Sequence, residues 1–364
     1  MTDRYLRYGP DVEQEQPHEA EDIAALRETF AEIRAEAFEK LRHAVRDAHA
    51  KSHGVLRGTL RIADGLPAEL RQGLFARSGD HPVIVRFSTA PGDIVSDGVG
   101  SALGMAIKVL EVDGPKVLPG DPQPRTQDFL LVNHPTISSG DVHTYRRDQA
   151  VLLQTSKAPE SVQLVATAAM RGAANVLRGV GVDRTGGPAG QAKPHVHPLG
   201  ETYWSQGALR YGDHVAKVSA APVSGNLTDL TGEHVTVREP SAYRDLTSAF
   251  FTEGGGIWEL RVQLATDLHT TPVEDASVPW PEDVTPYRAV ATLVIDPQDS
   301  SSPPRRVFGD DDLSFNPWHC LVEHRPLGSI QRVRRPVYDD STTYRSMMNA
   351  RPLGEPDGVD QMPS

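Results

Sequence analysis

The feature that most limits how this chain can fold is a succession of short segments in which apolar and polar residues alternate, separated by little more than turns. The alternation runs through residues 56–62, 83–88, 105–112 and 128–132. A period of two residues predicts strands that bury one face. Strands that follow one another through turns favour antiparallel pairing, because a parallel pair needs a long crossover between its strands.

Helical patterns stand as blocks before, between and after strands. Helices are predicted over residues 21–49, 144–179 and 327–346, and further strands near 208–219, 258–264 and 288–295. A chain of βαβ units would alternate helix and strand throughout, which this pattern does not do. We therefore predict an α+β fold, an antiparallel β-barrel with helical insertions and flanking helices.

Length and composition favour a single barrel-centred domain. The chain has 364 residues, and no internal repeat or low-complexity block divides it. Residues 1–20 and 351–364 are polar and rich in Pro, Asp and Glu, so we predict flexible tails there. The domain itself is then expected over residues 21–350.

Charge, apolar content and cysteine content exclude several classes of protein. The formal net charge of −12 argues against nucleic acid as a partner. The longest strongly apolar stretch, residues 289–295, is far shorter than the roughly 20 residues of a membrane-spanning helix. The amino-terminal sequence lacks the layout of a secretory signal, so we expect a cytoplasmic protein that acts on small molecules without membrane contact. The single cysteine, Cys320, excludes internal disulfides and cysteine-based clusters.

Two features suggest chemistry only weakly. His195 and His197 flank Val196 and could chelate a metal, but a histidine pair in a loop rich in Gly and Pro, with no carboxylate nearby, is more often incidental. Cys320 could be a nucleophile or a thiolate ligand, yet a lone cysteine in an apolar context usually packs as an inert side chain.

A stripe near the carboxyl end is more informative. Arg334, Tyr338 and Arg345 are spaced i, i+4 and i+11, which places them along one face of a helix. A guanidinium one turn from a tyrosine favours the phenolate, the form in which tyrosine can bind ferric haem. Alone, such a stripe is usually a solvated helix face, and Pro336 requires that the helix tolerate or begin near a proline.

Three other segments accompany this stripe: residues 46–51 (RDAHAK), 85–89 (VRFST) and 128–135 (DFLLVNHP). In order and approximate spacing they resemble the haem catalase family, with its motifs Arg-x-x-His-Ala-(Lys/Arg), Val-Arg-Phe-Ser-Thr, Asn ahead of x-Pro, and Arg-x-x-x-Tyr. Residues 104–108 are similar to the Gly-Phe-Ala-Val-Lys strand of that family, and residues 280–295 resemble its final barrel strand. The resemblance covers residues 40–350 and implies haem b as the cofactor.

The resemblance implies a role for each matching residue close to the iron. His49 is expected to be the distal acid–base and Asn133 its distal partner, with Ser88 bound to the distal imidazole. Tyr338 is expected to be the axial ligand of the haem iron, its phenolate supported by Arg334.

Three more arginines match residues that pair with haem propionates: Arg46, Arg86 and Arg345. His53 follows His49 by four residues and is a rival distal base. We prefer His49, because Arg46 and the Ala-Lys pair after it frame this histidine as the family motif requires.

Departures from the family pattern qualify the expected activity. The match is to the haem-binding core of a catalase, as in small catalase-related peroxidases. Ala48 stands where catalases usually carry Val, which leaves room above the iron for more than hydrogen peroxide. We therefore predict an enzyme that cleaves the O–O bond of hydrogen peroxide or organic hydroperoxides and oxidises a small organic co-substrate, as a monomer or small homo-oligomer. Rearrangement of a specific hydroperoxide, as in allene oxide synthases, and a non-catalytic haem-binding sensor remain alternatives.

Overall fold

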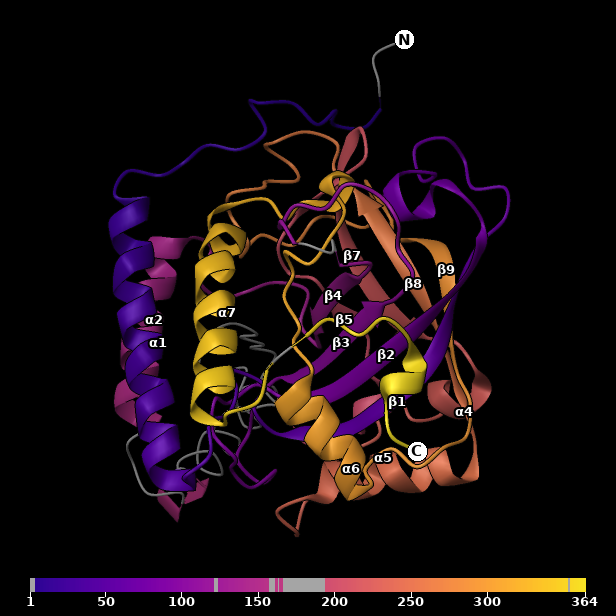
Figure 1. The fold of residues 1–364 in the computed structure, drawn as a ribbon. Coiled ribbons are helices and arrows are strands. Elements are labelled where there is room, and N and C mark those ends of the chain that lie inside the picture. The colour runs from indigo at the N-terminus through magenta and orange to yellow at the C-terminus, as the bar shows by residue number, and fades with distance from the viewer. Residues whose placement is uncertain (1–3, 121–123, 157–160, 163, 166–193, 353) are drawn as a thin grey trace, which may run out of the picture.

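Eight strands close into an antiparallel barrel (Figure 1). The structure is a computed structural model, and it describes residues 4–120, 124–156, 161–162, 164–165, 194–352 and 354–364. In ring order the strands are β5 (Tyr203–Trp204), β4 (Gln127–Val132), β3 (Leu103–Val109), β2 (Gly79–Thr89), β1 (Ser52–Ile62), β9 (Arg288–Ile295), β8 (Gly256–Leu264) and β7 (His214–Pro222). Strand β5 pairs with both β4 and β7 and so closes the ring, and β6 (Leu209–Tyr211) extends β7 as a hairpin. The predicted α+β fold with an antiparallel barrel is confirmed.

The two faces of β2 separate the core from the candidate site. Val83, Val85 and Phe87 belong to the large apolar cluster that fills the barrel. Because successive side chains of a strand point to opposite faces, Arg86 and Ser88 point out of the barrel. The motif that contains them therefore has an apolar side for the core and a polar side for the site.

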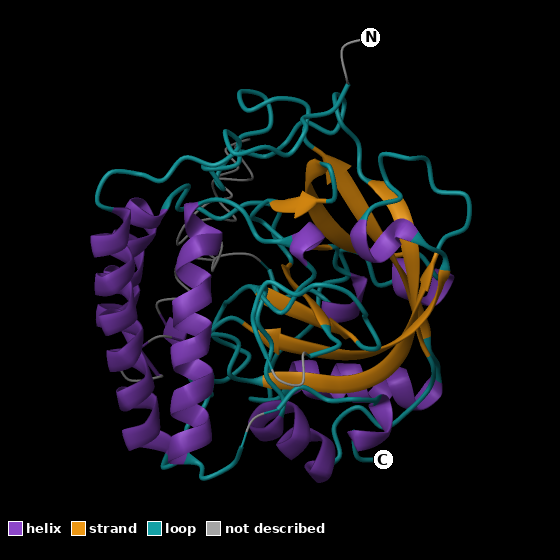
Figure 2. Cartoon of the chain, turned by 45° about the horizontal axis from the view of Figure 1, so that its top comes forward, coloured by secondary structure: helices purple, strands orange, loops and turns teal. Residues whose placement is uncertain are grey.

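Three helices stand side by side against one side of the barrel: α1 (Glu19–Leu41), α2 (Val142–Ser156) and α7 (Ser329–Met348) (Figures 1 and 2). A separate apolar cluster holds them together, with Leu26, Phe30, Val142, Val333 and Val337 as its buried members. The outer face of the barrel and helix α7 thus bring together the segments that carry the predicted site residues.

Shorter helical elements cover other parts of the barrel: α4 (Gly225–Thr228), α5 (Ala242–Glu253), α6 (Pro303–Val307), and the 3-10 turns η1 (Gly73–Ala76), η3 (Pro198–Gly200), η5 (Val322–His324) and η6 (Val359–Gln361). Helix α6 continues directly into a π-helical turn, η4 (Phe308–Asp312). Helix α5 is absent from the sequence-based prediction, although its buried residues Tyr243, Thr247 and Phe251 recur every four positions.

The first helix differs most from its prediction. It was expected to continue to residue 49, but α1 ends at Leu41, because Arg42 adopts left-handed backbone angles (φ 53°) and donates its N–H to the Phe38 carbonyl. Residues 42–51 form a loop instead. The predicted strand 208–219 is two strands, β6 and β7, and the part of the predicted helix 144–179 beyond residue 156 lies largely outside the described residues.

Both terminal segments contact the barrel domain. Val12 and Met362 are buried, and Glu13 forms an ion pair with Arg332 at 2.8 Å. Within the described residues, no helix has the length and apolar character needed to cross a membrane.

Candidate functional site

The loop of residues 42–51 carries His49 and is tied to two helices by Asp47. Its carboxylate pairs with Arg34 of α1 at 2.5 Å and accepts a hydrogen bond from Ser341 of α7 at 2.7 Å. Burial raises the pKa of Asp47 to about 6, and the nearby Arg34 opposes that rise. These bonds fix the loop that the sequence wrongly assigned to a helix.

His49 has a left-handed backbone conformation, with φ of 55°. A residue other than glycine there costs roughly 1–2 kcal/mol, so the surroundings must hold it. Its N–H donates to the Ala90 carbonyl at 2.9 Å, and its carbonyl accepts from Nη1 of Arg86 at 2.9 Å. The backbone that aims the imidazole is thus fastened on both sides.

The His49 ring lies between two strands of the barrel. Its Nδ1 is 3.0 Å from Oγ of Ser88 on β2. On β3, a Cβ at Gly104 would come within 2.4 Å of Nδ1 and 2.5 Å of Cε1. Only glycine at position 104 leaves room for the imidazole where it lies.

The electrostatic surroundings keep His49 neutral. Burial, together with the guanidinium groups of Arg86, Arg334 and Arg46, lowers its pKa to about 3. At pH 7 one ring nitrogen therefore carries a proton and the other can accept one. Among the described residues only Ser88 hydrogen-bonds the ring, which leaves Nε2 available.

His53 lies in a different environment from His49. It is buried in β1, and its ring packs edge-on against Tyr243 of α5 with centroids 5.4 Å apart. Burial lowers its pKa well below the ordinary value, and neither ring nitrogen has a partner among the described residues. Of the two rings, that of His49 is the one with a hydrogen bond to Ser88 among the described residues.

Asn133 follows β4, and its amide is held by β3. Its Oδ1 accepts from the Leu103 N–H at 2.8 Å, and its Nδ2 donates to Glu201 at 3.1 Å. Its own N–H donates to the Leu103 carbonyl at 3.0 Å. Because Leu103 precedes Gly104, the Asn133 amide is tied to the backbone that the His49 ring contacts. Glu201 was not predicted from the sequence and lies in a loop before β5.

Tyr338 and Arg334 lie one turn apart on α7, as their spacing predicts. Nη2 of Arg334 donates to the Tyr338 hydroxyl at 3.0 Å, and the guanidinium carbon is 5.2 Å from the ring centroid. Helix α7 continues through Pro336 without interruption. Burial and the neighbouring Tyr338 raise the pKa of Tyr145 above its ordinary value, so Tyr145 contributes a neutral phenol beside the pair.

The three remaining predicted arginines converge on one residue, Asp310. Arg46, Arg86 and Arg345 surround the turn η4 and, with Asp310 of that turn, form what we call the arginine cluster. Burial would raise the pKa of Asp310, but Arg86 and Arg46 outweigh it and keep that pKa below the ordinary value. Asp310 was not among the predicted site residues, and a run of three aspartates at 310–312 was the only sequence signal for it.

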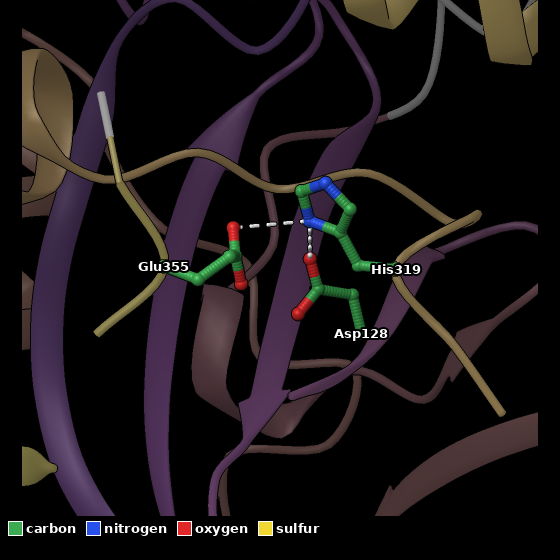
Figure 3. A group of neighbouring side chains, drawn as sticks. All are labelled: Asp128, His319 and Glu355. Atoms are coloured by element: carbon green, nitrogen blue, oxygen red, sulfur yellow. Dashed lines mark hydrogen bonds and ion pairs between the residues drawn. The ribbon is translucent and has the colours of Figure 1, made fainter. Parts of the chain in front are cut away.

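A second group of charges lies elsewhere on the barrel: Asp128, His319 and Glu355 (Figure 3), together with Lys108, which we call the balanced cluster. Nδ1 of His319 is 3.3 Å from Asp128 and 3.1 Å from Glu355. Nζ of Lys108 is 2.7 Å from Asp128 and also pairs with Glu355.

The composition of the balanced cluster resembles a metal site, but its charges are already paired. The carboxylates of Asp128 and Glu355 raise the pKa of His319 to about 9, even though burial acts in the opposite direction. A protonated imidazole cannot bind a metal. With the Lys108 ammonium on the same two carboxylates, a cation would have to displace two positive charges. We interpret the cluster as structural.

The two weak sequence candidates do not form a site with other described groups. Nδ1 of His195 lies 2.8 Å from the Tyr243 hydroxyl, whereas Nδ1 of His197 accepts from the Leu199 N–H at 3.3 Å. Cys320 is buried, and burial raises the pKa of its thiol. Its surroundings match the packing role favoured by its apolar sequence context.

The residues present fit a cofactor that carries carboxylates. The Nε of Arg345 is buried without an acceptor among the described residues. Both Arg46 and Arg345 donate to backbone carbonyls, which satisfy hydrogen bonds but carry no net charge. On α7, the Arg334–Tyr338 pair offers a hydroxyl oxygen as a ligand, held by the Arg334 guanidinium.

Comparison with solved structures identifies the class of fold. A fungal catalase matches with a TM-score of 0.56 and 17% sequence identity over 85% of this chain and 60% of the catalase. Catalase A from Saccharomyces cerevisiae gives 0.57 and 15% over 85% and 62%, and a bacterial catalase gives 0.56 and 17% over 88% and 64%. The chain therefore has a catalase-type fold and spans less than two thirds of the length of these catalases.

Sequence comparison adds no family assignment. No protein-family model matches the chain, and no curated protein matches it. At 15–17% identity the structural similarity establishes the fold alone.

Proposed function

We propose that this chain is a haem-dependent enzyme that cleaves the O–O bond of hydrogen peroxide or an organic hydroperoxide and oxidises a small organic substrate. The observation that carries the proposal is a neutral His49 held on Ser88, near an Arg334–Tyr338 pair, in a catalase-type fold. A protein that only bound haem would need neither an available imidazole nitrogen nor a backbone fastened around it.

Four residues would hold the cofactor. Tyr338 would bind the haem iron through its side-chain oxygen, which Arg334 holds by a hydrogen bond. Arg46 and Arg345 would bind the carboxylates. A bound haem would supply the redox-active iron that takes up the oxidising equivalents of the peroxide.

His49 would move the proton. Its available nitrogen accepts a proton from one peroxide oxygen and returns it to the other, which leaves as water or an alcohol. The balance is ROOH + AH₂ → ROH + H₂O + A, in which the O–O bond is reduced by two electrons and AH₂ is an organic donor of two hydrogen atoms.

Asn133 would orient the peroxide by donating a hydrogen bond to it, not by accepting one. Its Oδ1 already accepts from Leu103, and one of its two Nδ2 hydrogens serves Glu201. The remaining hydrogen can bond a peroxide oxygen without titrating.

The small side chain of Ala48 supports an organic peroxide or co-substrate. Ala48 precedes His49 and is exposed, so a bulkier reactant than hydrogen peroxide can approach along this side. We therefore expect oxidation of an organic donor to match or exceed dismutation of hydrogen peroxide.

The proposal is tested by absorbance spectra of the chain reconstituted with ferric haem, as wild type, Tyr338→Phe and His49→Ala. We expect a high-spin ferric phenolate spectrum in wild type, its loss in Tyr338→Phe, and its retention in His49→Ala. Tyr344→Phe on the same helix and His269→Ala on the surface are matched controls. Reconstituted wild type without a Soret band would falsify the proposal.

Turnover then separates this function from its alternatives. Peroxide-driven oxidation of an aromatic dye should occur in wild type and fall at least about a hundred-fold in His49→Ala, the usual contribution of a positioned acid–base. Product formed from a hydroperoxide without any donor would favour rearrangement. A haem spectrum without turnover would favour a sensor.

A further inference from the structure

An open cavity of about 560 Å³ lies between helix α5 and the segment that leads into helix α6, two helices that Figure 1 shows on the same side of the barrel. We call it the α5–α6 groove. Its volume is within the roughly 300–1,000 Å³ of small-molecule sites. The lining is polar and includes Ser248 and Thr252 of α5 and Asp299, Ser301 and Ser302 before α6. None of these residues belongs to the predicted peroxide site.

Two arginines lie at one end of the α5–α6 groove. Arg244 precedes Ser248 by one turn of α5. Arg306 follows Ser302 by one turn, and its backbone N–H donates to the Ser302 carbonyl at 3.0 Å. Burial lowers the pKa of Arg244, and the charge of Arg306 lowers it further. The two guanidinium groups are therefore near neighbours, each one turn beyond a serine of the lining.

Neither guanidinium group has an ion pair with a carboxylate of the described residues. The Nε atoms of Arg244 and Arg306 are both buried without a hydrogen-bond partner there. Nη2 of Arg244 donates to the Ser52 carbonyl at 3.2 Å, which satisfies one donor but offers no charge. Buried donors without acceptors cost free energy, so a ligand that supplies acceptors at this end would gain it.

The carboxylates that act on Arg244 from a distance do not neutralise it. These are Asp310, Asp97 and Asp245. Asp310 and Asp97 lie 2.8 and 2.6 Å from cations of their own, and Asp245 is exposed. Two positive charges without a direct counter-ion therefore remain at the end of the groove, and they favour an anionic ligand.

The rest of the α5–α6 groove does not favour a second anionic group. Oδ1 of Asp299 accepts from the N–H groups of Ser301 and Ser302 at 2.8 and 2.9 Å, which fixes this carboxylate in the lining. A carboxylate repels other anions and accepts hydrogen bonds from hydroxyl groups. Serine and threonine hydroxyls beside it can donate to a ligand or accept from it. The lining therefore suits a neutral part that carries hydroxyl groups.

We propose that the α5–α6 groove binds a small hydroxylated compound that carries one phosphate monoester, a sugar phosphate for example, with its phosphate on Arg244 and Arg306. A phosphate monoester has a charge of about −1.5 to −2 at neutral pH, which matches two guanidinium groups better than the single charge of a carboxylate does. Arginine binds phosphate oxygens through paired N–H groups. The site does not rest on the proposed function, because it shares no residue with the peroxide site.

The phosphate part is tested by NMR of the full chain, through the side-chain Nε–Hε resonances of Arg244 and Arg306. Ribose 5-phosphate should shift both resonances, because each N–H gains a charged acceptor, and ribose without phosphate should shift neither. The shifts should persist in Arg46→Gln, in which the arginine cluster has lost a charge. The resonance of Arg61, which lies at an exposed pair with Asp80, is the internal control.

The same shifts, followed against ligand concentration, give the affinity at this site alone. We expect Arg244→Gln, followed at Arg306, and Arg306→Gln, followed at Arg244, each to weaken binding of ribose 5-phosphate about ten-fold or more. Ser248→Ala should weaken binding of ribose 5-phosphate about three-fold and leave that of inorganic phosphate unchanged, because its hydroxyl faces the neutral part. Arg61→Gln should change neither affinity.

Each result supports or overturns a stated part of the proposal. Unshifted resonances of both arginines in ribose 5-phosphate would overturn it entirely. Equal affinities for ribose 5-phosphate and inorganic phosphate would overturn the hydroxylated ligand. If Arg244→Gln does not fold, because its bond to Ser52 is lost, Arg306→Gln decides, and unchanged affinity there would overturn the two-arginine site. Haem takes no part in these measurements, so a failure of the proposed function would leave them unaffected.

Discussion

The arginine cluster and the balanced cluster both bury several charges, but only one of them matches its charges one to one. In the balanced cluster, Lys108 and protonated His319 face the carboxylates of Asp128 and Glu355. In the arginine cluster, Arg86 binds the carboxylate of Asp310, whereas Arg46 and Arg345 donate to the backbone carbonyl of the same residue, so three guanidinium groups lie beside one carboxylate.

The balance of charge in each cluster distinguishes buried charges that stabilise the fold from buried charges that can bind a ligand. Burial of a charge costs free energy unless a partner of opposite charge compensates it. A matched cluster has no capacity for a further ion. A cluster with surplus positive charge gains stability from an added anion, and this one adjoins the residues predicted to handle peroxide.

Removal of Lys108 should have the largest effect of the predicted changes. The Lys108→Met variant leaves Asp128 and Glu355 buried without their main counter-ion, so we expect the free energy of unfolding to fall by about 3–5 kcal/mol. Urea denaturation measures this, with Lys40→Met, at an exposed pair with Asp93, as the control. A loss no greater than that of the control would mean that the balanced cluster does not hold the fold.

Removal of the Asp310 charge should cost less and should respond to anions. We expect Asp310→Asn to lower the free energy of unfolding by about 2 kcal/mol, because the amide still accepts hydrogen bonds but no longer balances the arginines. Phosphate at matched ionic strength should restore part of the loss, since it can replace the missing charge. Equal restoration of Lys108→Met by phosphate would break the distinction between the two clusters.

The balanced cluster should also weaken in alkali. The pKa of His319 is raised from its ordinary 6.5 to about 9, so its contribution is fully present below about pH 6.5 and is lost as the pH rises through 9. Between pH 6.5 and 9, the free energy of unfolding of wild type should fall by on the order of 2 kcal/mol more than that of His319→Asn. Denaturation curves at several pH values measure the difference, and parallel pH profiles for the two proteins would contradict it.

The sequence predicted the features that depend on short-range spacing. The strands of the barrel were predicted apart from the two-residue β5, and alternation with a period of two identified β1 to β4. The four-residue spacing of Arg334 and Tyr338 identified a contact that depends only on helix geometry. The contact of His49 with Ser88 was available only from the resemblance, because 39 residues separate the two.

Contacts between distant segments escaped prediction. Asp310 lies 224 residues from Arg86, and the balanced cluster joins β3, β4, the loop before α7 and the carboxyl-terminal segment. No local pattern encodes such pairings. The predicted end of the first helix, at residue 49, was wrong for a related reason. Residues 42–49 have a composition as compatible with a helix as that of the preceding turns. Hydrogen bonds to Asp47 and His49 from distant segments determine the loop.

Substitution of Gly104 should have the smallest effect of the predicted changes, and it should affect His49 without affecting the balanced cluster. A Cβ at this position would meet the His49 ring at 2.4 Å, so Gly104→Ala must displace the imidazole from Ser88, at about 1–2 kcal/mol of stability for the forced repacking. The ¹⁵N resonances of His49 should shift and those of His319 should not, because the balanced cluster does not involve this part of β3. Gly225→Ala, where a Cβ meets nothing within 4 Å, is the matched control. If Gly104→Ala left His49 unchanged, the room provided by glycine would not be what places the imidazole, and the link between the arginine cluster and this histidine would rest on Arg86 alone.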